Sequence, residues 1–389
     1  MNTSAPTKIR PYERWLPVAI DFFLVISFFH ISVQVARDVA AGGNGWKQGD
    51  WLINSINGDV RRGFSGDLFI YASDIFGTEL LTLVAVTQVA LLGLLFLAFR
   101  TLLRGINPST TAILAISPAI FTVFWVADPQ GSVRKELLTF LGLTVCALGI
   151  VRERDIFFAA GAFIVSIGFL AHEAMILFLP LMWALLALSW SSKKRSILKS
   201  ILVVIVSFFS FYALHFALSN IQVPSSGMVC QPLMERGLDK RICDGTIAWL
   251  TYDRAQGQQA VLSNLSPAST AYFVLSYLAA MAPFFYLLMR CQKRPLALMF
   301  LIASAIPFLP LYFVAVDWGR WVSLHIFSVV LLTAVAFQIG KLRLTRDIDP
   351  VMLSVLITGA LLVSPGHMIG MEMRGALERL ISDRWIFLN

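Results

Sequence analysis

The sequence carries little charge for its length. Asp, Glu, Lys and Arg make up 14% of its 389 residues, whereas about a quarter of the residues in a soluble globular protein are charged. Hydrophobic residues account for 57% of the chain, and its mean hydropathy is +0.74. This scarcity of charge excludes a typical soluble domain and predicts that lipid is the main solvent of the folded chain.

The chain also lacks the motifs of several common functions. It has no glycine-rich nucleotide-binding motif, no cysteine and histidine spacing typical of zinc, and no convincing internal repeat, so neither a cofactor nor a metal is expected. The formal charge of +8 would suit nucleic acid if Lys and Arg formed one basic face. They are instead scattered between apolar runs, which excludes nucleic acid as an expected partner.

Cysteine is scarce as well, with four in the chain. Cys146 falls in an apolar run and Cys291 follows Arg290, whereas Cys230 and Cys243 share one polar segment. Only this last pair is a candidate disulfide. It would close a small ring and contribute about 3 kcal/mol in an oxidising compartment.

Long apolar runs are abundant. About 20 apolar helical residues cross a hydrocarbon core of about 30 Å, and these runs predict an all-α polytopic membrane protein of about eleven transmembrane helices in one domain. The first run is longer than the roughly 7 to 15 apolar residues of a signal peptide, so we expect an uncleaved helix. The predicted segments are 16–36, 80–99, 110–127, 137–151, 156–171, 174–190, 201–218, 271–289, 296–316, 322–340 and 351–364.

Lys and Arg in the connections predict the orientation, because short basic connections remain in the cytoplasm. With a cytoplasmic amino terminus, which carries Lys8, Arg10 and Arg14, every short cytoplasmic connection is basic and the carboxyl terminus is periplasmic. This arrangement is typical of the bacterial cytoplasmic (inner) membrane. The residues concerned are Arg100, Arg104, Arg152, Arg154, Lys193, Lys194, Arg195, Lys199, Arg290, Lys293, Arg294, Lys341, Arg343 and Arg346.

The apolar stretch 156–190 decides the number of helices, since only His172 and Glu173 interrupt it. A single helix of this length would measure about 52 Å at 1.5 Å per residue, which exceeds the hydrocarbon core. It would also turn the later basic connections outward. We therefore predict two short helices that meet at His172 and Glu173.

Two outer loops are long, residues 37–79 and 219–270. The second is expected to contain short helices, with 246–262 as a candidate surface helix. The tail 367–389 is predicted to be an interfacial amphipathic helix, and the alternative is a disordered tail. Its apolar residues are Met368, Met371, Leu377, Leu380 and Trp385.

Dense polar strings fall on the outer face in this orientation, at residues 59–67, 128–136, 172–173 and 317–321. Outer loops hold polar residues simply because water is there. However, the helices behind these strings are short and draw charges toward the hydrocarbon, where an unpaired charge costs at least about 2.5 to 3.5 kcal/mol. Charges at such a depth pair with one another or line a wet cavity.

Arg61 and Arg62 suit an anionic group such as phosphate, because guanidinium groups bind oxyanions bidentately. Gly63 and Gly66 nearby permit a close approach of the backbone. The alternative for this string is an interfacial turn that is paired internally with Asp59 and Asp67.

Arg134 and Lys135 open a helix, so backbone N–H groups can join an anion site; the alternative is anchoring of the helix end at the interface. Arg320 lies between Trp318 and Trp321, which places a cation beside aromatic faces suited to a sugar ring. Tryptophan is also common at membrane interfaces, which is the alternative for this string.

Glu173 is the preferred general base, because burial in a partly apolar hollow raises the pKa of a carboxyl group toward the useful range. Asp59 and Asp317 are the next candidates, and His172 is assigned to substrate binding. A structural role in joining two helices is the alternative for His172 and Glu173.

Arginines for phosphate, tryptophans for sugars and carboxylates for proton transfer suit polyprenyl-(pyro)phosphate-linked sugars. On these strings the chain resembles membrane polysaccharide polymerases of the Wzy or EpsG type and, more distantly, GT-C-like glycosyltransferases. The resemblance implies glycosyl transfer from a lipid-linked glycan to an acceptor glycan in O-antigen or exopolysaccharide biosynthesis, with polysaccharide-assembly proteins as partners. GT-C enzymes carry an acidic pair in the first outer loop, whereas here Arg61 stands where the carboxylate paired with Asp59 would be.

The main alternative is a transporter or flippase for a lipid-linked or small polar solute. Transporters place ionisable residues near the bilayer midplane, often within inverted repeats, and the predicted midplane of this chain is poor in charge. A non-catalytic assembly subunit is the third possibility, and its polymer chemistry would survive changes in the polar strings.

Overall fold

The computed structural model describes residues 11–191, 196–219 and 225–382. Within these ranges the regular structure is helical, apart from two isolated β-bridges that join Cys291 to Leu344 and Ser364 to Arg374. The all-α class expected from the sequence is therefore confirmed. Of the residues named above, the following lie outside the described residues: Lys8, Arg10, Lys193, Lys194, Arg195 and Trp385.

Seven segments of the described chain are long and apolar enough to cross a membrane, so the chain is a multi-pass membrane protein. They are α1 (Leu16–Ala40, preceded by η1, Pro11–Arg14), α4 (Leu80–Leu103), η3 with α9 (Glu173–Phe178 and Leu179–Ser191), α10 (Ile197–Ser219), α14 (Pro267–Arg290), α15 with η5 (Arg294–Ala303 and Ile306–Phe313) and α16 (Trp318–Gln338). Three shorter apolar helices accompany them, α7 (Glu136–Val151), α8 (Asp155–Ala171) and α17 (Pro350–Leu362).

The remaining predicted segment, 110–127, is broken. It forms α5 (Pro108–Ala115) and α6 (Phe121–Ala127), with Pro118 between them, and proline lacks the N–H group that continues a helix. Thr122 Oγ1 donates to Ala115 O at 2.6 Å, which satisfies one carbonyl at the break. A single straight helix was therefore the wrong prediction for this segment.

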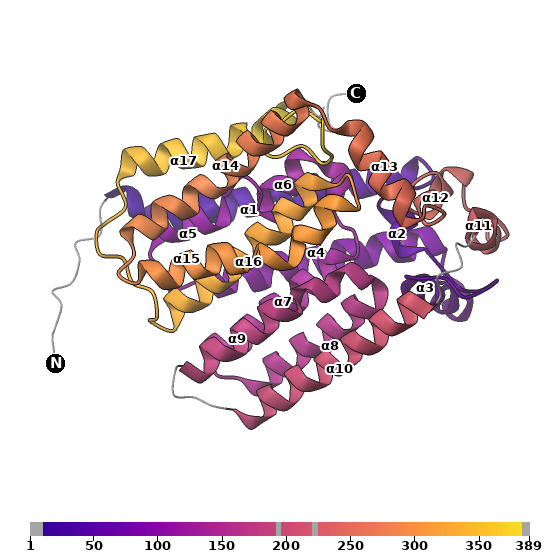
Figure 1. Cartoon of the computed structure of the whole chain (residues 1–389), viewed down its shortest axis with the longest axis horizontal. Helices are drawn as coiled ribbons and strands as arrows, with labels where there is room; N and C mark the ends of the chain where they lie inside the picture. The colour runs from indigo at the N-terminus through magenta and orange to yellow at the C-terminus, as the bar shows by residue number, and fades with distance from the viewer. Residues whose placement is uncertain (1–10, 192–195, 220–224, 383–389) are drawn as a thin grey trace.

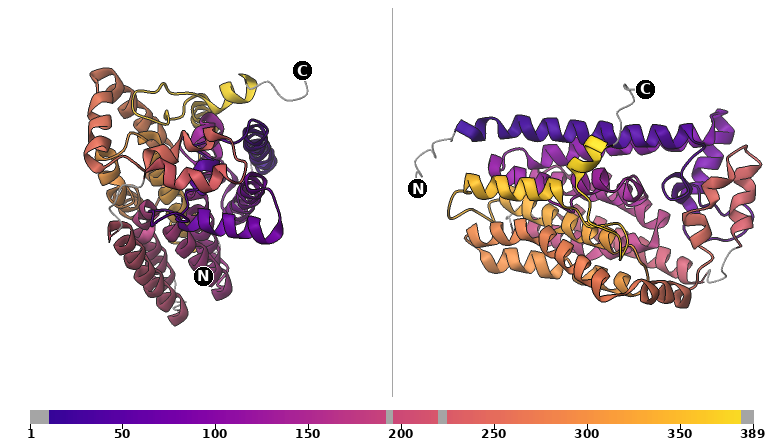
Figure 2. Two further views of the ribbon diagram at one scale, coloured as in Figure 1. Left: turned by 90° about the vertical axis from the view of Figure 1, so that its right-hand side faces the viewer. Right: turned by 90° about the horizontal axis from the view of Figure 1, so that it is seen from above.

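Helix α16 lies at the centre of the bundle, and 89% of its most apolar stretch is buried. It packs against α7, α9, α14 and α15, and Phe327 of α16 stacks on Phe140 of α7 with ring centroids 4.0 Å apart. The outer helices expose large apolar side chains such as Phe22 and Phe208, which suits lipid rather than water. Figure 2 shows α1 along one flank of the bundle.

The break predicted at His172 is present. Helix α8 ends at Ala171, and His172 adopts an extended backbone conformation with φ −154° and ψ 110°. Its Nδ1 accepts a hydrogen bond from Ala174 N at 3.2 Å, which caps the following helix. The stretch 156–190 thus forms two helices, as the length argument required.

The basic connections meet at one end of the bundle. Contacts join all five of them into one network, so helix ends that are far apart in the sequence lie together. The contacts are Gln338 Nε2 to Leu102 O, Lys341 Nζ to Ser191 O, Lys199 Nζ to Asp155 Oδ1, and Thr345 N to Arg290 O.

The long loops form the other end, where short helices gather (Figure 1). The first loop contains α2 (Gln48–Trp51) and α3 (Phe64–Phe76), and the second contains α11 (Ser226–Met234), η4 (Lys240–Cys243), α12 (Thr246–Trp249) and α13 (Arg254–Asn264). The two loops pack on each other so closely that a Cβ on Gly45 would lie 2.7 Å from Gly245 N. Thr246 N also donates to Gly45 O at 3.0 Å.

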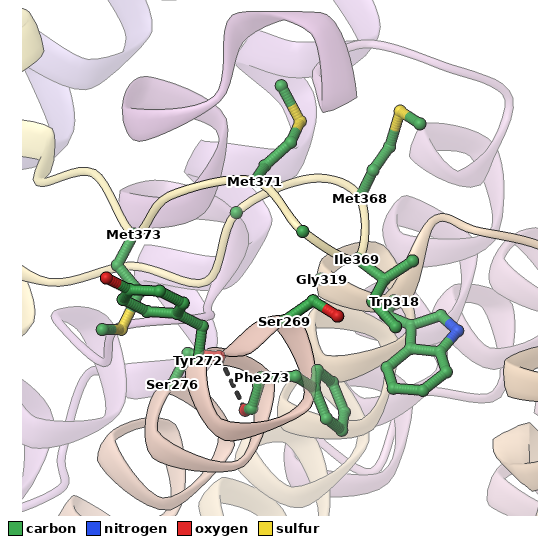
Figure 3. Close-up of a pocket in the computed structure, with 12 residues that line it drawn as sticks. Ser269, Tyr272, Phe273, Ser276, Trp318, Gly319, Met368, Ile369, Met371 and Met373 are labelled. Carbon is green, nitrogen blue, oxygen red and sulfur yellow. Dashed lines mark hydrogen bonds between the residues drawn. The ribbon is translucent and has the colours of Figure 1, made fainter. Parts of the chain in front are cut away.

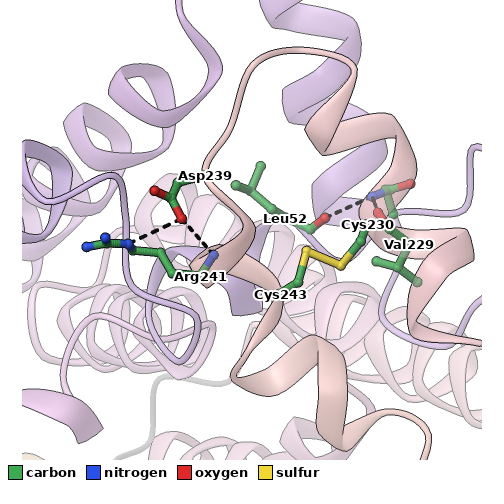
Figure 4. Close-up of a disulfide and its surroundings, with 7 residues drawn as sticks. Leu52, Val229, Cys230, Asp239, Arg241 and Cys243 are labelled. Atoms are coloured by element: carbon green, nitrogen blue, oxygen red, sulfur yellow. Dashed lines mark hydrogen bonds and ion pairs between the residues drawn. A yellow bond between two sulfur atoms is a disulfide. The ribbon is translucent and has the colours of Figure 1, made fainter.

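A disulfide joins Cys230 of α11 to Cys243 of η4 (Figure 4). The polar segment that contains it is tied to the first loop, because Asn54 Nδ2 donates to Val229 O at 2.9 Å. The candidate helix 246–262 is instead two helices. The first ends at Trp249, and Asp253 caps the second through a hydrogen bond from Gln256 N at 2.7 Å.

The tail differs from the predicted amphipathic helix. Residues 364–375 form an irregular segment that folds back over the loop end, with Gly319 N donating to His367 O at 3.1 Å and Ile369 N donating to Val316 O at 2.9 Å. In the part of the tail that the structure describes, which ends at residue 382, the helical segment is α18 (Ala376–Ser382). The backbone of 364–375 pairs with the rest of the chain, which an isolated interfacial helix would not do.

Candidate functional site

The four polar strings converge at the loop end. Glu173 and Asp317 stand at the starts of the segments Glu173–Ser191 and Trp318–Gln338, whose other ends reach the basic connections. Ion pairs and hydrogen bonds join the strings to one another and to two further segments. We call the joined residues the polar cluster: Asp50, Arg61, Arg62, Asp128, Arg134, Lys135, Glu136, His172, Glu173, Asp317, Arg320 and His367.

Arg62 and Glu173 form a bidentate pair across 111 residues of sequence. Arg62 Nε donates to Glu173 Oε2 and Arg62 Nη2 donates to Glu173 Oε1, both at 2.7 Å. Arg61 Nη1 lies 3.9 Å from Glu173 Oε1, and its side chain is 35% exposed. We expected Glu173 to lie in a partly apolar hollow, and this prediction is wrong. Two guanidinium groups face the carboxylate and favour its charged form.

Lys135 is fully buried between Asp50 and Arg62. Its backbone N–H donates to Asp50 Oδ2 at 3.2 Å, and its Nζ donates to Arg62 O at 2.9 Å. Burial lowers the pKa of Lys135 to about 8, although the charge of Asp50 favours the ammonium form. Burial raises the pKa of Asp50, but Lys135 and Arg134 outweigh this effect and hold it below its usual value.

Asp317 contacts three basic residues of the cluster. Its Oδ2 accepts from Arg320 Nη1 at 2.7 Å and lies 3.8 Å from Arg134 Nη1, while its Oδ1 lies 3.5 Å from His367 Nε2. Arg320 also pairs with Glu136, and both of these side chains are almost fully buried. Burial raises the pKa of Asp317, but the hydrogen bond and charge of His367 keep it below its usual value.

His367 comes from the tail and was not predicted as a site residue. Its Nδ1 lies 2.6 Å from Asp128 Oδ2, so it stands between Asp128 and Asp317. Burial lowers the pKa of His367, but the two carboxylates outweigh burial and raise it above its usual value. Asp50 was missed as well. Both residues are single polar positions in weakly patterned loops, so no local signal separates them from solvated loop residues.

His172 acts as a helix cap in this arrangement. Burial lowers its pKa to about 3, so the imidazole is neutral and its Nδ1 is free to accept from Ala174 N. The structural role weighed for this residue is therefore present in the fold. Its assignment to substrate binding remains a prediction.

The tryptophans at 318 and 321 are less open than the sequence suggested. Trp321 is 4% exposed, and the Arg320 guanidinium carbon lies 5.3 Å from its ring centroid. Trp318 donates from Nε1 to Tyr312 O at 3.1 Å and packs edge-on against Phe273. The prediction that the ring of Trp321 offers a surface for sugar stacking is thus wrong, because protein encloses this ring.

A different set of aromatic residues lines the rim of the cluster. Arg134 lies over the ring of Trp46, 5.6 Å from its centroid, and Trp46 contacts Trp249 at 6.1 Å. Tyr252 follows at 4.6 Å from Trp249 and is 42% exposed. These rings come from the two long loops, which offered no clear aromatic pattern in the sequence.

Only some residues of the string 59–67 belong to the polar cluster. Arg61 and Arg62 join the cluster, whereas Asp59 is exposed and no interaction found among the described residues links it to the cluster. Asp67 accepts from Ser55 N at 2.7 Å. The turn paired internally with Asp59 and Asp67 is not formed, because Arg61 and Arg62 face Glu173 instead. A Cβ on Gly66 would lie 2.1 Å from Ile53 O, so the close approach at this glycine is to the chain's own backbone.

Two residues at the cluster hold strained backbone conformations, Arg62 with φ +69° and Val133 with φ +49°. Left-handed φ values are costly for residues other than glycine, most of all for β-branched ones. Val133 O accepts hydrogen bonds from Trp51 Nε1 at 2.8 Å and Gln88 Nε2 at 2.9 Å, which hold this conformation in place. Strain of this kind concentrates at functional sites.

Free space at the cluster is small. A hollow beside Trp318 and the tail methionines, including Met368 and Met371, has a volume of about 10 Å³ (Figure 3). The paired side chains of Glu136 and Arg320 form part of the wall of a second hollow of the same volume. Each has room for about one water molecule. Neither hollow has room for a ligand of typical size, which needs about 300 to 1,000 Å³. Within the described ranges, no three His, Cys, Asp or Glu side chains are arranged to hold a metal ion.

Comparison of the chain with protein-family models, curated proteins and solved structures gives no match.

Proposed function

We propose that the protein is a membrane glycosyltransferase or polysaccharide polymerase that acts on polyprenyl-(pyro)phosphate-linked sugars at the outer face of the bacterial cytoplasmic membrane. In this proposal the chain crosses the membrane eleven times, with a cytoplasmic amino terminus and the polar cluster on the periplasmic side. The observation that carries the proposal is the meeting of five cations and five carboxylates at one end of a lipid-embedded bundle. The cations are Arg61, Arg62, Arg134, Lys135 and Arg320, and the carboxylates are Asp50, Asp128, Glu136, Glu173 and Asp317.

Arg61 is the cation that a phosphate meets first. Its side chain is 35% exposed, and its nearest carboxylate oxygen is 3.9 Å away, whereas Arg62 and Arg320 are held by contacts of 2.7 Å. Arginine binds phosphate in the same bidentate manner as carboxylate. A phosphate that reaches Arg61 can therefore compete with Glu173 for the guanidinium of Arg62.

This exchange supplies the base. When the phosphate binds the guanidinium of Arg62, the carboxylate of Glu173 loses its bidentate partner and is free to accept a proton. The acceptor hydroxyl oxygen then bonds to the anomeric carbon of the lipid-linked glycan as the bond from that carbon to the pyrophosphate oxygen breaks, and the hydroxyl proton moves to Glu173. Arg61 and Arg62 stabilise the charge that develops on the leaving pyrophosphate.

The test uses purified protein in liposomes with a lipid-linked glycan, and the length of the product glycan is measured. Glu173→Gln keeps the shape of the side chain but removes the base, and we expect polymerisation to fall by about 100-fold or more. The matched control is Asp74→Asn, because Asp74 pairs with Arg236 at the surface outside the cluster. Wild-type chain extension by a well-folded Glu173→Gln protein would remove the assignment.

The closed packing of the cluster favours one alternative, a transporter or flippase for a lipid-linked or small polar solute. In that case the pair of Arg62 with Glu173 closes an outer gate instead of activating an acceptor. The same liposomes separate the two functions. A flippase moves the lipid-linked glycan between leaflets and leaves its chain length unchanged, whereas a polymerase lengthens it.

A further inference from the structure

A large apolar cavity lies between α9, α15 and α16, away from the polar cluster. Its volume is about 500 Å³, compared with about 10 Å³ for the hollows of the cluster. Helices α9 and α15 both pack on α16, so α16 forms the floor and the other two helices form the walls. The cavity is the size of a typical ligand site, which measures about 300 to 1,000 Å³.

Small side chains on the facing helices create this space. Ala184 and Ala187 of α9 face Ala303 and Ser304 across the cavity, and Ser328 lies on its floor. Ala187 and Ala303 are exposed, so the cavity opens sideways on the surface of the bundle. In a membrane this opening faces lipid tails, because the surrounding helix surfaces are apolar.

The cavity is closed toward the polar cluster and reaches the basic end of the bundle. Phe178 and Phe308 meet edge-on with centroids 5.0 Å apart, and Phe178 also contacts Phe327. These rings form a barrier on the side of the cluster. At the other end the cavity is lined by Ser191 and Lys341, whose Nζ donates one hydrogen bond to Ser191 O.

Lys341 therefore sets the polar end of an otherwise apolar cavity. An ammonium group has three donors, and the bond to Ser191 O uses one, which leaves others for a ligand. The connections around this end carry further basic residues, including Lys293, Arg294 and Arg343. This combination of an apolar cavity with a cationic end matches a lipid with apolar chains and an anionic headgroup.

We propose that the cavity binds one anionic phospholipid from the leaflet at the basic end, with an acyl chain between α9 and α15 and the phosphate at Lys341. A chain in the cavity restores the van der Waals contacts that the small side chains leave unmade. The charge pairing with Lys341 selects the headgroup. The phenylalanine barrier separates this lipid from the polar cluster, so the site is independent of the glycan chemistry.

The test is a lipid titration of the purified protein in detergent, read as the rise in unfolding temperature. Phosphatidylglycerol is the anionic probe, phosphatidylcholine the zwitterionic one, and polyprenyl phosphate the competing isoprenoid. Lys341→Gln removes the charge, and Arg343→Gln is the matched control, since Arg343 is exposed on the same connection and does not line the cavity. Ala184→Phe fills the cavity.

We expect phosphatidylglycerol to stabilise the wild type saturably and more strongly than phosphatidylcholine. Lys341→Gln reduces that preference by about fivefold, as expected for one lysine near a lipid phosphate, while Arg343→Gln keeps it. Ala184→Phe weakens the binding of both phospholipids, and if that variant does not fold, the two glutamine variants decide. Equal responses of Lys341→Gln and Arg343→Gln would overturn the proposal, as would equal stabilisation by the two phospholipids or displacement of phosphatidylglycerol by polyprenyl phosphate.

Discussion

The two ends of the helical bundle differ in what they bury and in how tightly they are packed. At the loop end, charged side chains are buried against one another and leave hollows of about 10 Å³. Toward the basic end, small apolar side chains leave a cavity of about 500 Å³. A buried charge without a partner is far more costly than an apolar void that a lipid chain can fill, so tight packing is required only where the charges lie.

The largest expected effect comes from breaking the buried pair of Arg320 with Glu136. Arg320→Ala leaves both Glu136 and Asp317 without their closest cation, and removing one partner of a buried pair costs about 3 to 5 kcal/mol. Chemical unfolding of the purified protein measures this loss. Arg236→Ala is the control, because its pair with Asp74 lies at the surface, where water screens the two charges and the loss is much smaller. Equal losses for the two variants would contradict the distinction between cluster and surface.

The disulfide of the second long loop should have the next largest effect. The bond between Cys230 and Cys243 closes a loop with a sequence separation of 13, and its loss should cost about 3 kcal/mol. The double variant to serine is compared with Cys146→Ala, which alters a free buried cysteine in α7. Proteolysis of the 225–264 region reports local opening. If this region is as resistant in the double variant as in the wild type, the disulfide does not hold the loop.

The contacts of His367 with Asp128 and Asp317 should make the free energy of unfolding depend on pH. The pKa of His367 is raised above its usual value of 6.5 in the folded state, so its stabilising contribution is complete below pH 6.5 and is lost as the pH rises through the raised pKa. Unfolding curves recorded between pH 5 and pH 9 should show this loss in the wild type. His367→Gln should lack it, and a parallel pH dependence of the two proteins would contradict the assignment.

The smallest effects come from adding volume at each end. Ala184→Leu projects into the large cavity and should change the free energy of unfolding little, because the cavity has room for the added atoms. Ser323→Leu projects into the hollow beside Glu136 and Arg320, where overpacking costs about 1 to 3 kcal/mol. The unfolding temperatures of the two variants give the comparison. A greater loss for Ala184→Leu would show that the cavity is not the softer region.

The sequence predicted most of the long helices, because hydrophobicity is a local property. The apolar runs marked the long helices, and the length of 156–190 required the break that the structure places at His172. The broken segment around Pro118 and the irregular tail were not predicted, since both depend on contacts with distant parts of the chain.

The candidate site was predictable in part. The predicted topology placed Arg62, Glu173 and Asp317 on one face of the membrane. No sequence spacing, however, predicts that Arg62 pairs with a residue 111 positions away. The same limit explains why Asp50 and His367 were missed and why the enclosed ring of Trp321 was expected to be open. Which face of a helix meets its neighbour depends on packing, and the sequence pattern of a buried helix is apolar on all sides.

The most direct test of glycosyl transfer at the polar cluster is a structure of the protein with a polyprenyl pyrophosphate bound in a lipid nanodisc. We expect a phosphate oxygen within hydrogen-bond distance of both Arg61 and Arg62, with the carboxylate of Glu173 released from Arg62. A pyrophosphate bound elsewhere, with the pair of Arg62 and Glu173 intact, would contradict the claim that the polar cluster is the site of glycosyl transfer.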